Sequence, residues 1–202
     1  FMSDIICVTN RLLCKEDFLS RIEKIALVHP KAIILREKDL SKQEYKELAV
    51  SVLEICRKHN TPCILHSFFD VASELDCKSL HLPLPILKSL SQKDRERFTE
   101  LGASCHSLED AVEAERLGCT YITAGHIFDT DCKKGVAGRG IDFLKTVCRG
   151  VSIPCYAIGG ISPKNIFQIR SAGAKGACIM SGGMICDNVQ SYFNSFCGDS
   201  SF

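Results

Sequence analysis

Cys63-Ile64-Leu65 is an unbroken apolar run that stands between Pro62 and His66. A strand with one face in water alternates apolar and polar residues, whereas an uninterrupted apolar strand is buried on both faces. Parallel sheets are buried in this way because helices cover both of their faces. This run therefore predicts a parallel β-sheet covered by helices.

Similar β-rich runs recur along the chain, and charged stretches with helical spacing separate them. Residues 42–59 show that spacing, and Ser41 with Glu44 three residues later matches a capping box. Residues 107–117 repeat the pattern, with Ser107 as the N-cap. The β-rich runs are residues 4–10, 32–37, 62–66, 79–83, 102–106, 121–125, 155–160 and 176–182.

The number of these units and the length of the chain favour a closed barrel. Eight βα units in 202 residues fit a (β/α)8 barrel, whose lower size limit is about 200 residues. We therefore expect an α/β fold, a (β/α)8 TIM barrel, as a single domain over residues 1–202. The fourth unit is the weakest, because residues 79–83 lead into Pro83 and Pro85 before a helix expected at 93–101.

Composition gives no sign of a macromolecular partner. Lys and Arg total 25 against 24 Asp and Glu, a formal charge of +1, so neither nucleic acid nor an anionic membrane is expected as a partner. The sequence contains no signal-peptide pattern and no apolar run of membrane-spanning length. We expect a soluble, cytoplasmic protein with a small-molecule substrate, and the sequence leaves a homo-oligomer open.

The cysteines, 13 in number, are scattered without a C-x-x-C pair. A zinc site normally groups its thiolates at such spacings, so no metal site is expected. Cys63, Cys155 and Cys178 lie in apolar runs, where a cysteine packs as a small hydrophobic residue. The pattern favours buried, reduced thiols, with structural disulfides or a metal as the alternative.

Polar side chains gather where the predicted strands end. In a (β/α)8 barrel these carboxyl ends meet at one mouth, which is where such enzymes bind substrate. Four of the 6 histidines lie there, and neutral imidazole can act as acid or base near neutral pH. One histidine alone would favour a structural role, but four in equivalent places favour a catalytic one. These strand-end residues are Arg36, Lys38, His66, Ser67, His81, Ser104, His106 and His126.

Glycine pairs follow the last two predicted strands. Glycine lets backbone N–H groups approach an anion, and the loops after strands seven and eight are the usual phosphate site of this fold. Tight turns are the alternative role of these glycines. We expect the backbone of Gly159, Gly160, Ser181 and Gly182 to bind a phosphate group.

Residues 125–140 form the longest predicted loop, which is polar, cationic and rich in glycine. A solvated surface loop is one interpretation. Its expected place over the barrel mouth favours a lid on an anionic substrate, with Thr130, Lys133 and Lys134 as candidate contacts.

Four motifs carry a resemblance that extends over nearly the whole chain. They are residues 35–38 (Leu-Arg-Glu-Lys), 102–107, 125–140 and 157–161, and the run Gly-His-Ile-Phe-Asp-Thr-Asp-Cys-Lys-Lys-Gly in the third is the most specific. On these residues the chain resembles the thiamine-phosphate synthase superfamily and, within it, the TenI-type thiazole tautomerases.

The chain departs from the synthase pattern at the metal site. In synthases, the resemblance implies, an Asn-Asp pair after strand three and an acidic residue after strand four hold Mg²⁺ and a pyrimidine pyrophosphate. Those places hold His66-Ser67 and, at residues 84–86, nothing acidic, whereas Mg²⁺ needs hard oxygen ligands. His126 stands where synthases have proline, and Ile34 where they have glutamine. These departures favour isomerisation over displacement of pyrophosphate.

The tautomerase resemblance implies conversion of a non-aromatic carboxythiazole phosphate into its aromatic isomer, with no cofactor and no metal. His126 is then the proton carrier, while Arg36 and Lys38 bind the substrate carboxylate or balance charge. Glu37 more often holds such cations in place than acts in catalysis. The other expected pocket residues are His66, His81, Ser104 and His106.

Three other functions remain open. A true thiamine-phosphate synthase is disfavoured by the missing Mg²⁺ ligands. A regulatory barrel would bind the thiazole phosphate without turnover, and the near-neutral charge argues against direct DNA binding by such a protein. A zinc site could combine the histidines with Cys105 or Cys132.

Overall fold

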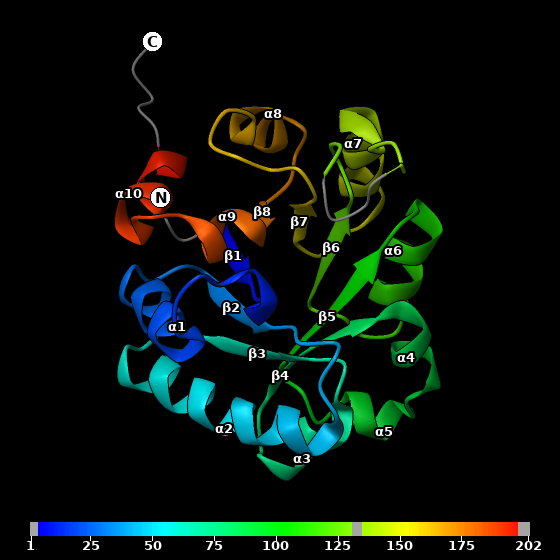
Figure 1. The fold of residues 1–202 in the computed structure, drawn as a ribbon. Coiled ribbons are helices and arrows are strands. Elements are labelled where there is room, and N and C mark those ends of the chain that lie inside the picture. The colour runs from blue at the N-terminus through cyan, green and yellow to red at the C-terminus, as the bar shows by residue number, and fades with distance from the viewer. Residues whose placement is uncertain (1–3, 131–134, 198–202) are drawn as a thin grey trace.

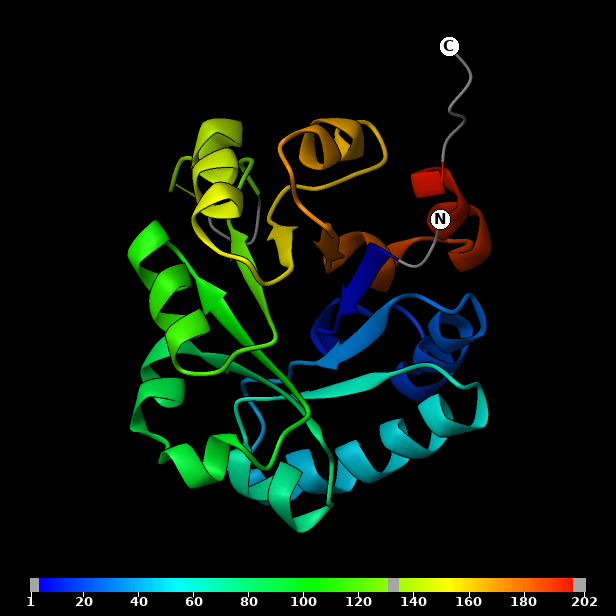
Figure 2. The same ribbon diagram turned by 180° about the vertical axis from the view of Figure 1, so that it is seen from behind.

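The strands of this chain close into a barrel. The computed structural model describes residues 4–130 and 135–197. Neighbouring strands pair in parallel in sequence order, and β1 also pairs with β8, so the predicted (β/α)8 barrel is confirmed. Figures 1 and 2 show the strands from two sides, surrounded by helices. The strands are β1 (Ile5–Val8), β2 (Ala32–Leu35), β3 (Cys63–His66), β4 (Ser79–Pro83), β5 (Glu100–Cys105), β6 (Tyr121–Gly125), β7 (Cys155–Ile158) and β8 (Gly176–Ile179).

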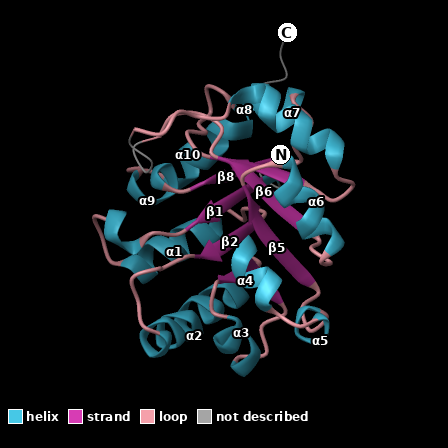
Figure 3. Ribbon diagram, turned by 90° about the vertical axis from the view of Figure 1, so that its right-hand side faces the viewer, coloured by secondary structure: helices cyan, strands magenta, loops and turns pink. Residues whose placement is uncertain are grey.

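Helices follow the strands and form the outer layer, as Figure 3 shows. The predicted capping box begins α2: the Ser41 hydroxyl accepts from the Glu44 N–H, and the Glu44 carboxylate accepts from the Ser41 N–H. Ser107 caps α6 through the N–H of Asp110. The helices are α1 (Phe18–Leu27), α2 (Lys42–Lys58), α3 (Phe69–Glu74), α4 (Leu84–Ser89), α5 (Gln92–Arg95), α6 (Leu108–Arg116), α7 (Gly140–Gly150), α8 (Ile166–Ser171), α9 (Ser181–Ile185) and α10 (Val189–Asn194), with short 3-10 turns η2 (Arg11–Leu13) and η4 (Ser195–Cys197).

The fourth unit differs from the expectation. The helix predicted at 93–101 was wrong, because α5 ends at Arg95 and β5 already begins at Glu100. Instead, α4 starts directly after β4 with Pro85 in its first turn. A proline there loses no hydrogen bond and has a backbone angle suited to a helix, so it starts the helix rather than blocking it.

Side chains along each strand alternate between two cores. Ile5 and Cys7 belong to the large core that includes the helices, whereas Ile6 and Val8 belong to a smaller cluster within the barrel. Both faces are therefore buried, which explains the unbroken apolar runs. The smaller cluster contains Ile6, Val8, Ala32, Ile34, Ile64, Tyr121, Tyr156 and Cys178.

The described cysteines are free thiols, and Cys132 lies outside the described residues. Fewer cysteines are buried than the sequence indicated, because half of the described ones are partly exposed. The buried ones are Cys7, Cys56, Cys105, Cys119, Cys155 and Cys178. Across residues 4–130 and 135–197, the search for a helix with the length and apolar character of a bilayer crossing finds none.

Candidate functional site

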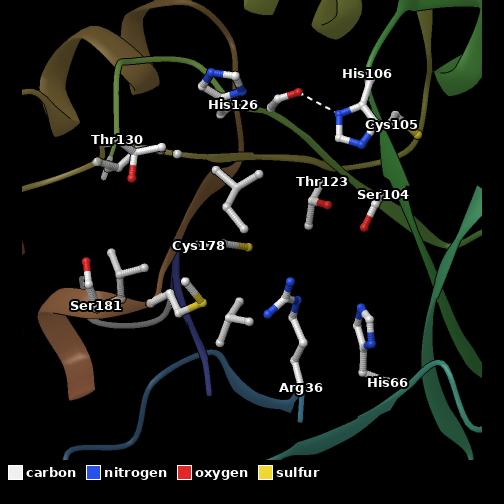
Figure 4. A pocket seen from close by; sticks show the side chains of 18 of the residues that line it. Arg36, His66, Ser104, Cys105, His106, Thr123, His126, Thr130, Cys178 and Ser181 are labelled. Atoms are coloured by element: carbon white, nitrogen blue, oxygen red, sulfur yellow. Dashed lines mark hydrogen bonds between the residues drawn. The ribbon is translucent and has the colours of Figure 1, made fainter. Parts of the chain in front are cut away.

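A pocket of about 300 Å³ lies at the carboxyl ends of the strands. The convergence expected from the sequence is therefore present: residues from β1 and from β3 to β8 share one cavity with residues of the segments that follow the strands, Arg36 and Lys38 after β2 among them (Figure 4). The predicted site residues that line it are Arg36, Lys38, His66, Ser104, His106, His126, Thr130, Gly159, Gly160, Ser181 and Gly182.

The remaining predicted residues lie elsewhere. His81 is buried, 2% exposed, and is not among the residues that line the pocket. It can therefore act on a substrate only indirectly, through its hydrogen bond with Ser104. Lys133 and Lys134 lie outside the described residues. The sequence interpretation missed the less polar part of the wall. Strand alternation would have identified Val8, Pro83, Thr123, Ile158 and Cys178, but not Cys105, which belongs to the outer core, or Met180, which follows β8.

Glu37 fixes the chain between the two cations at the end of β2. Its carboxylate is buried and accepts from the Thr9 hydroxyl at 2.7 Å and from the Arg11 N–H at 3.0 Å. The Thr9 hydroxyl in turn accepts from the Arg36 N–H at 2.9 Å. Glu37 therefore holds the backbone from which Arg36 and Lys38 reach the pocket.

His81 is buried behind the pocket wall and hydrogen-bonds two hydroxyl groups. Its Nδ1 lies 3.0 Å from the Tyr121 hydroxyl and its Nε2 lies 2.9 Å from the Ser104 hydroxyl. Burial lowers the pKa of His81 to about 3, so the ring is uncharged at neutral pH. A neutral imidazole has one N–H, so the ring donates to one of these hydroxyls and accepts a hydrogen bond from the other. His81 thereby orients the Ser104 hydroxyl.

His66 lines the pocket as a second neutral imidazole. It stacks on His81 with 5.7 Å between ring centroids, and its Nδ1 lies 2.7 Å from the Ser67 hydroxyl. Burial, together with the positive potential of His81, Arg36 and Lys38, lowers the pKa of His66 well below its ordinary value. The ring therefore adds hydrogen-bonding capacity without adding charge.

The lowered pKa values of His66 and His81 predict that the folded chain is less stable in acid. An unfolded histidine titrates near 6.5, whereas His81 in the fold titrates near 3. Between those values the unfolded chain binds more protons than the folded chain, so the free energy of unfolding falls as the pH falls. From His81 alone we expect a loss of about 2 kcal/mol between pH 7 and pH 5. Denaturant unfolding at both pH values measures it, and His81→Gln should show a smaller loss. An equal loss in both proteins would contradict the assignment.

His106 forms a hydrogen bond with the last residue of β6, directly before His126. Its Nδ1 lies 2.8 Å from the Gly125 carbonyl, the contact drawn as a dashed line in Figure 4. Because a carbonyl only accepts, this nitrogen carries a proton. Asp110 accepts from the His106 N–H at 2.8 Å and so ties the residue to the first turn of α6.

His126 directly follows β6 and lies at the upper edge of the pocket in Figure 4. It is 5% exposed, and its Nε2 lies 3.1 Å from the Val136 carbonyl. Because a carbonyl only accepts, Nε2 carries a proton. Nδ1 is buried and has no hydrogen-bond partner within the described parts of the chain. Nδ1 thus has an unengaged lone pair, but the protein encloses this atom, so a substrate proton would reach it only after the residues around it move.

The glycines after β7 are required by close packing. Gly159 has φ +101°, and a Cβ there would lie 2.2 Å from the His126 Cβ. Gly160 has φ +65°, and a Cβ there would lie 2.6 Å from the Asp129 carbonyl oxygen. Both residues therefore let the segment after β6 cross directly over the end of β7. The tight-turn role is present, and phosphate binding by the same backbone stays a prediction.

The described pocket residues do not fit a synthase-type magnesium site. The wall contains no Asp or Glu among the described residues that line it. Nor do three His, Cys, Asp or Glu side chains gather anywhere in residues 4–130 and 135–197 closely enough to hold a metal ion. Magnesium prefers oxygen ligands, usually including one or two carboxylates. The described wall offers imidazoles, hydroxyls and cations in their place.

Comparison with known proteins identifies the family. The sequence profile of the TMP-TENI family, described as thiamine monophosphate synthase, matches residues 5–182. The chain belongs to the TMP-TENI family. A thiamine-phosphate synthase of Clostridium tetani is 30% identical over 200 residues, which is 93% of this chain and 94% of that protein. Thiamine-phosphate synthase 2 of Streptococcus pneumoniae is 32% identical over 193 residues, 94% and 91% of the two chains.

A solved structure of a thiamine phosphate enzyme is also similar to this chain. Thiamine phosphate pyrophosphorylase from Pyrococcus furiosus superimposes with a TM-score of 0.83 at 25% identity, covering 97% of this chain and 94% of that one. The relatives named here are described as synthases or a pyrophosphorylase. They therefore support the transferase alternative better than the tautomerase expectation, which they leave unconfirmed.

Proposed function

We propose that this chain is an enzyme of thiamine biosynthesis that isomerises a carboxythiazole phosphate to its aromatic form. The observation that carries the proposal is His126, an imidazole with an unpartnered nitrogen that lines a pocket whose described residues include no carboxylate. Such a pocket suits an anionic substrate and a proton transfer. Membership of a family described as thiamine monophosphate synthase supports a thiazole phosphate as the substrate.

The two ends of the pocket suit the two anionic groups of that substrate. Gly159, Gly160 and Gly182 line the pocket, and their backbone N–H groups are the proposed phosphate ligands. Arg36 enters the pocket from the side opposite His126 in Figure 4, where its guanidinium suits a ring carboxylate. A thiazole ring held between them would face the histidines of the wall.

The reaction needs one proton removed from the ring and one delivered to the exocyclic carbon. His126 Nδ1 takes the ring proton, and the carbon–hydrogen electron pair enters the ring system as it becomes aromatic. The exocyclic double bond shifts its electrons to its terminal carbon, which takes a proton from the imidazolium. The proton on Nε2, held by the Val136 carbonyl, keeps Nδ1 as the exchanging atom throughout.

Thiamine-phosphate synthesis is the second candidate, and the descriptions of the relatives favour it. That reaction joins a pyrimidine to a thiazole phosphate and releases pyrophosphate. The described wall has Arg36 and Lys38 to offer to a pyrophosphate, yet it provides no carboxylate for a magnesium ion. The same thiazole phosphate pocket would serve either reaction.

One assay separates the two candidates. Purified protein is given the non-aromatic carboxythiazole phosphate in one reaction, and the aromatic thiazole phosphate with pyrimidine pyrophosphate and Mg²⁺ in another. We expect catalysed formation of the aromatic carboxythiazole in the first and no enzymatic pyrophosphate release in the second. Release of pyrophosphate with formation of thiamine phosphate, without isomerisation, would replace the proposal by the second candidate.

A further inference from the structure

Two corners of the barrel share one sequence pattern. Cys56 to Cys63 and Cys148 to Cys155 both read Cys-Arg, four further residues, Pro-Cys. Each corner joins the end of an outer helix to the start of the next strand, α2 to β3 and α7 to β7. In each corner the two thiols interact and shift one another's pKa. The spacing therefore places a thiol pair at each of these turns.

The α7–β7 corner opens into a second cavity. This cavity has a volume of about 470 Å³ and includes both Cys148 and Cys155 in its lining, with Lys175 as the charged residue on the wall. Cys148 is partly exposed, whereas Cys155 is 4% exposed. The hydrogen bond from Cys155 lowers the pKa of the Cys148 thiol. Figure 2 shows this corner in yellow, where the chain turns from the outer helix into the strand.

The α2–β3 corner also pairs a buried thiol with a partly exposed one, Cys63, but the pKa of its exposed thiol is shifted in the other direction. Cys56 is 1% exposed and is buried among core residues. The hydrogen bond with Cys56 and burial together raise the pKa of the Cys63 thiol well above its ordinary value. A thiol reacts through its thiolate, so Cys63 should react more slowly than Cys148, which has the lowered pKa and lines the open cavity.

We infer that Cys148 and Cys155 form a redox modification site, with Cys148 as the attacking thiol and Cys155 as the resolving thiol. An accessible thiol beside a buried partner is the arrangement found at redox-sensitive sites. The reagent class is a low-molecular-weight disulfide. The Cys148 thiolate attacks one of its sulfurs, that S–S bond breaks, and one small thiolate leaves. The Cys155 thiolate then attacks the Cys148 sulfur and releases the second small thiol, so two protein thiols are oxidised while one disulfide is reduced.

Oxidised glutathione followed by tryptic peptide mapping tests the inference. Trypsin cuts after Arg149 in one corner and after Arg57 in the other, so each pair is separated unless a disulfide links its peptides. After free thiols are blocked, we expect linked peptides that contain Cys148 and Cys155, whereas the Cys56 and Cys63 peptides carry the blocking group. Equal oxidation of the two corners, or no oxidation at Cys148, would overturn the inference.

Single substitutions test the order of attack. Cys155→Ala should leave Cys148 as a mixed disulfide with glutathione, because the resolving thiol is gone. Cys148→Ser should leave Cys155 unmodified at the same glutathione concentration, because Cys155 is buried. A glutathione adduct on Cys155 in the second variant, formed as fast as the adduct on Cys148 in the first, would contradict the assigned roles.

Discussion

His126→Gln is expected to slow isomerisation of the thiazole phosphate by about 10²–10⁴-fold, the usual contribution of a general acid–base group. Glutamine retains the apolar stem that packs beside Gly159 but cannot carry a proton back and forth at Nδ1. The turnover number should fall while the affinity for the substrate changes little. Steady-state rates and direct binding of the substrate measure the two effects separately.

A histidine outside the pocket provides the control for that experiment. His29 follows α1, is exposed, and is not among the pocket-lining residues. His29→Gln should therefore retain the activity of the unaltered chain. If His126→Gln also retained full activity while folded, His126 would have no part in the proton transfer.

Gly159→Ala is the second substitution with a large expected effect. A Cβ at residue 159 would lie 2.2 Å from the Cβ of His126 and 2.7 Å from its Cα, so the segment after β6 must move. Misplacement of a reacting group by about 1 Å can cost about 10²-fold in rate. A non-glycine residue at φ +101° also adds strain, which costs about 1–3 kcal/mol. We expect losses of that size in activity and in unfolding free energy.

Gly118→Ala separates strain from steric displacement. Gly118 has a similar φ of +92°, yet a Cβ there would meet no atom within 4 Å. Alanine at this residue should cost stability through backbone strain and leave the rate unchanged. Comparison by thermal unfolding and kinetics then isolates the clash with His126. Equal activity of the two variants would show that Gly159 does not position the catalytic segment.

Much of the barrel could be predicted because local signals agree with the fold. Unbroken apolar runs mark strands buried on both faces, and the Ser41–Glu44 capping box is present as expected at the start of α2. The convergence of His66, His106 and His126 followed from the single rule that strand ends share one mouth.

Other features depend on contacts that the sequence does not encode locally. His66 and His81 pair in register, but His66 ends β3 whereas β4 continues to Pro83, so Pro83 lines the pocket and His81 lies below it, between the hydroxyls of Tyr121 and Ser104. In the fourth unit, Pro85 starts a helix that the pattern placed later in the chain.

Proton NMR of the carboxythiazole phosphate, incubated with the protein in buffer containing EDTA, tests the proposed isomerase most directly. The central claim predicts enzyme-dependent loss of the exocyclic vinyl signal at a rate that added Mg²⁺ does not raise, and abolition of that loss in His126→Gln. A substrate spectrum that stays unchanged with EDTA and converts only when Mg²⁺ is supplied would contradict it.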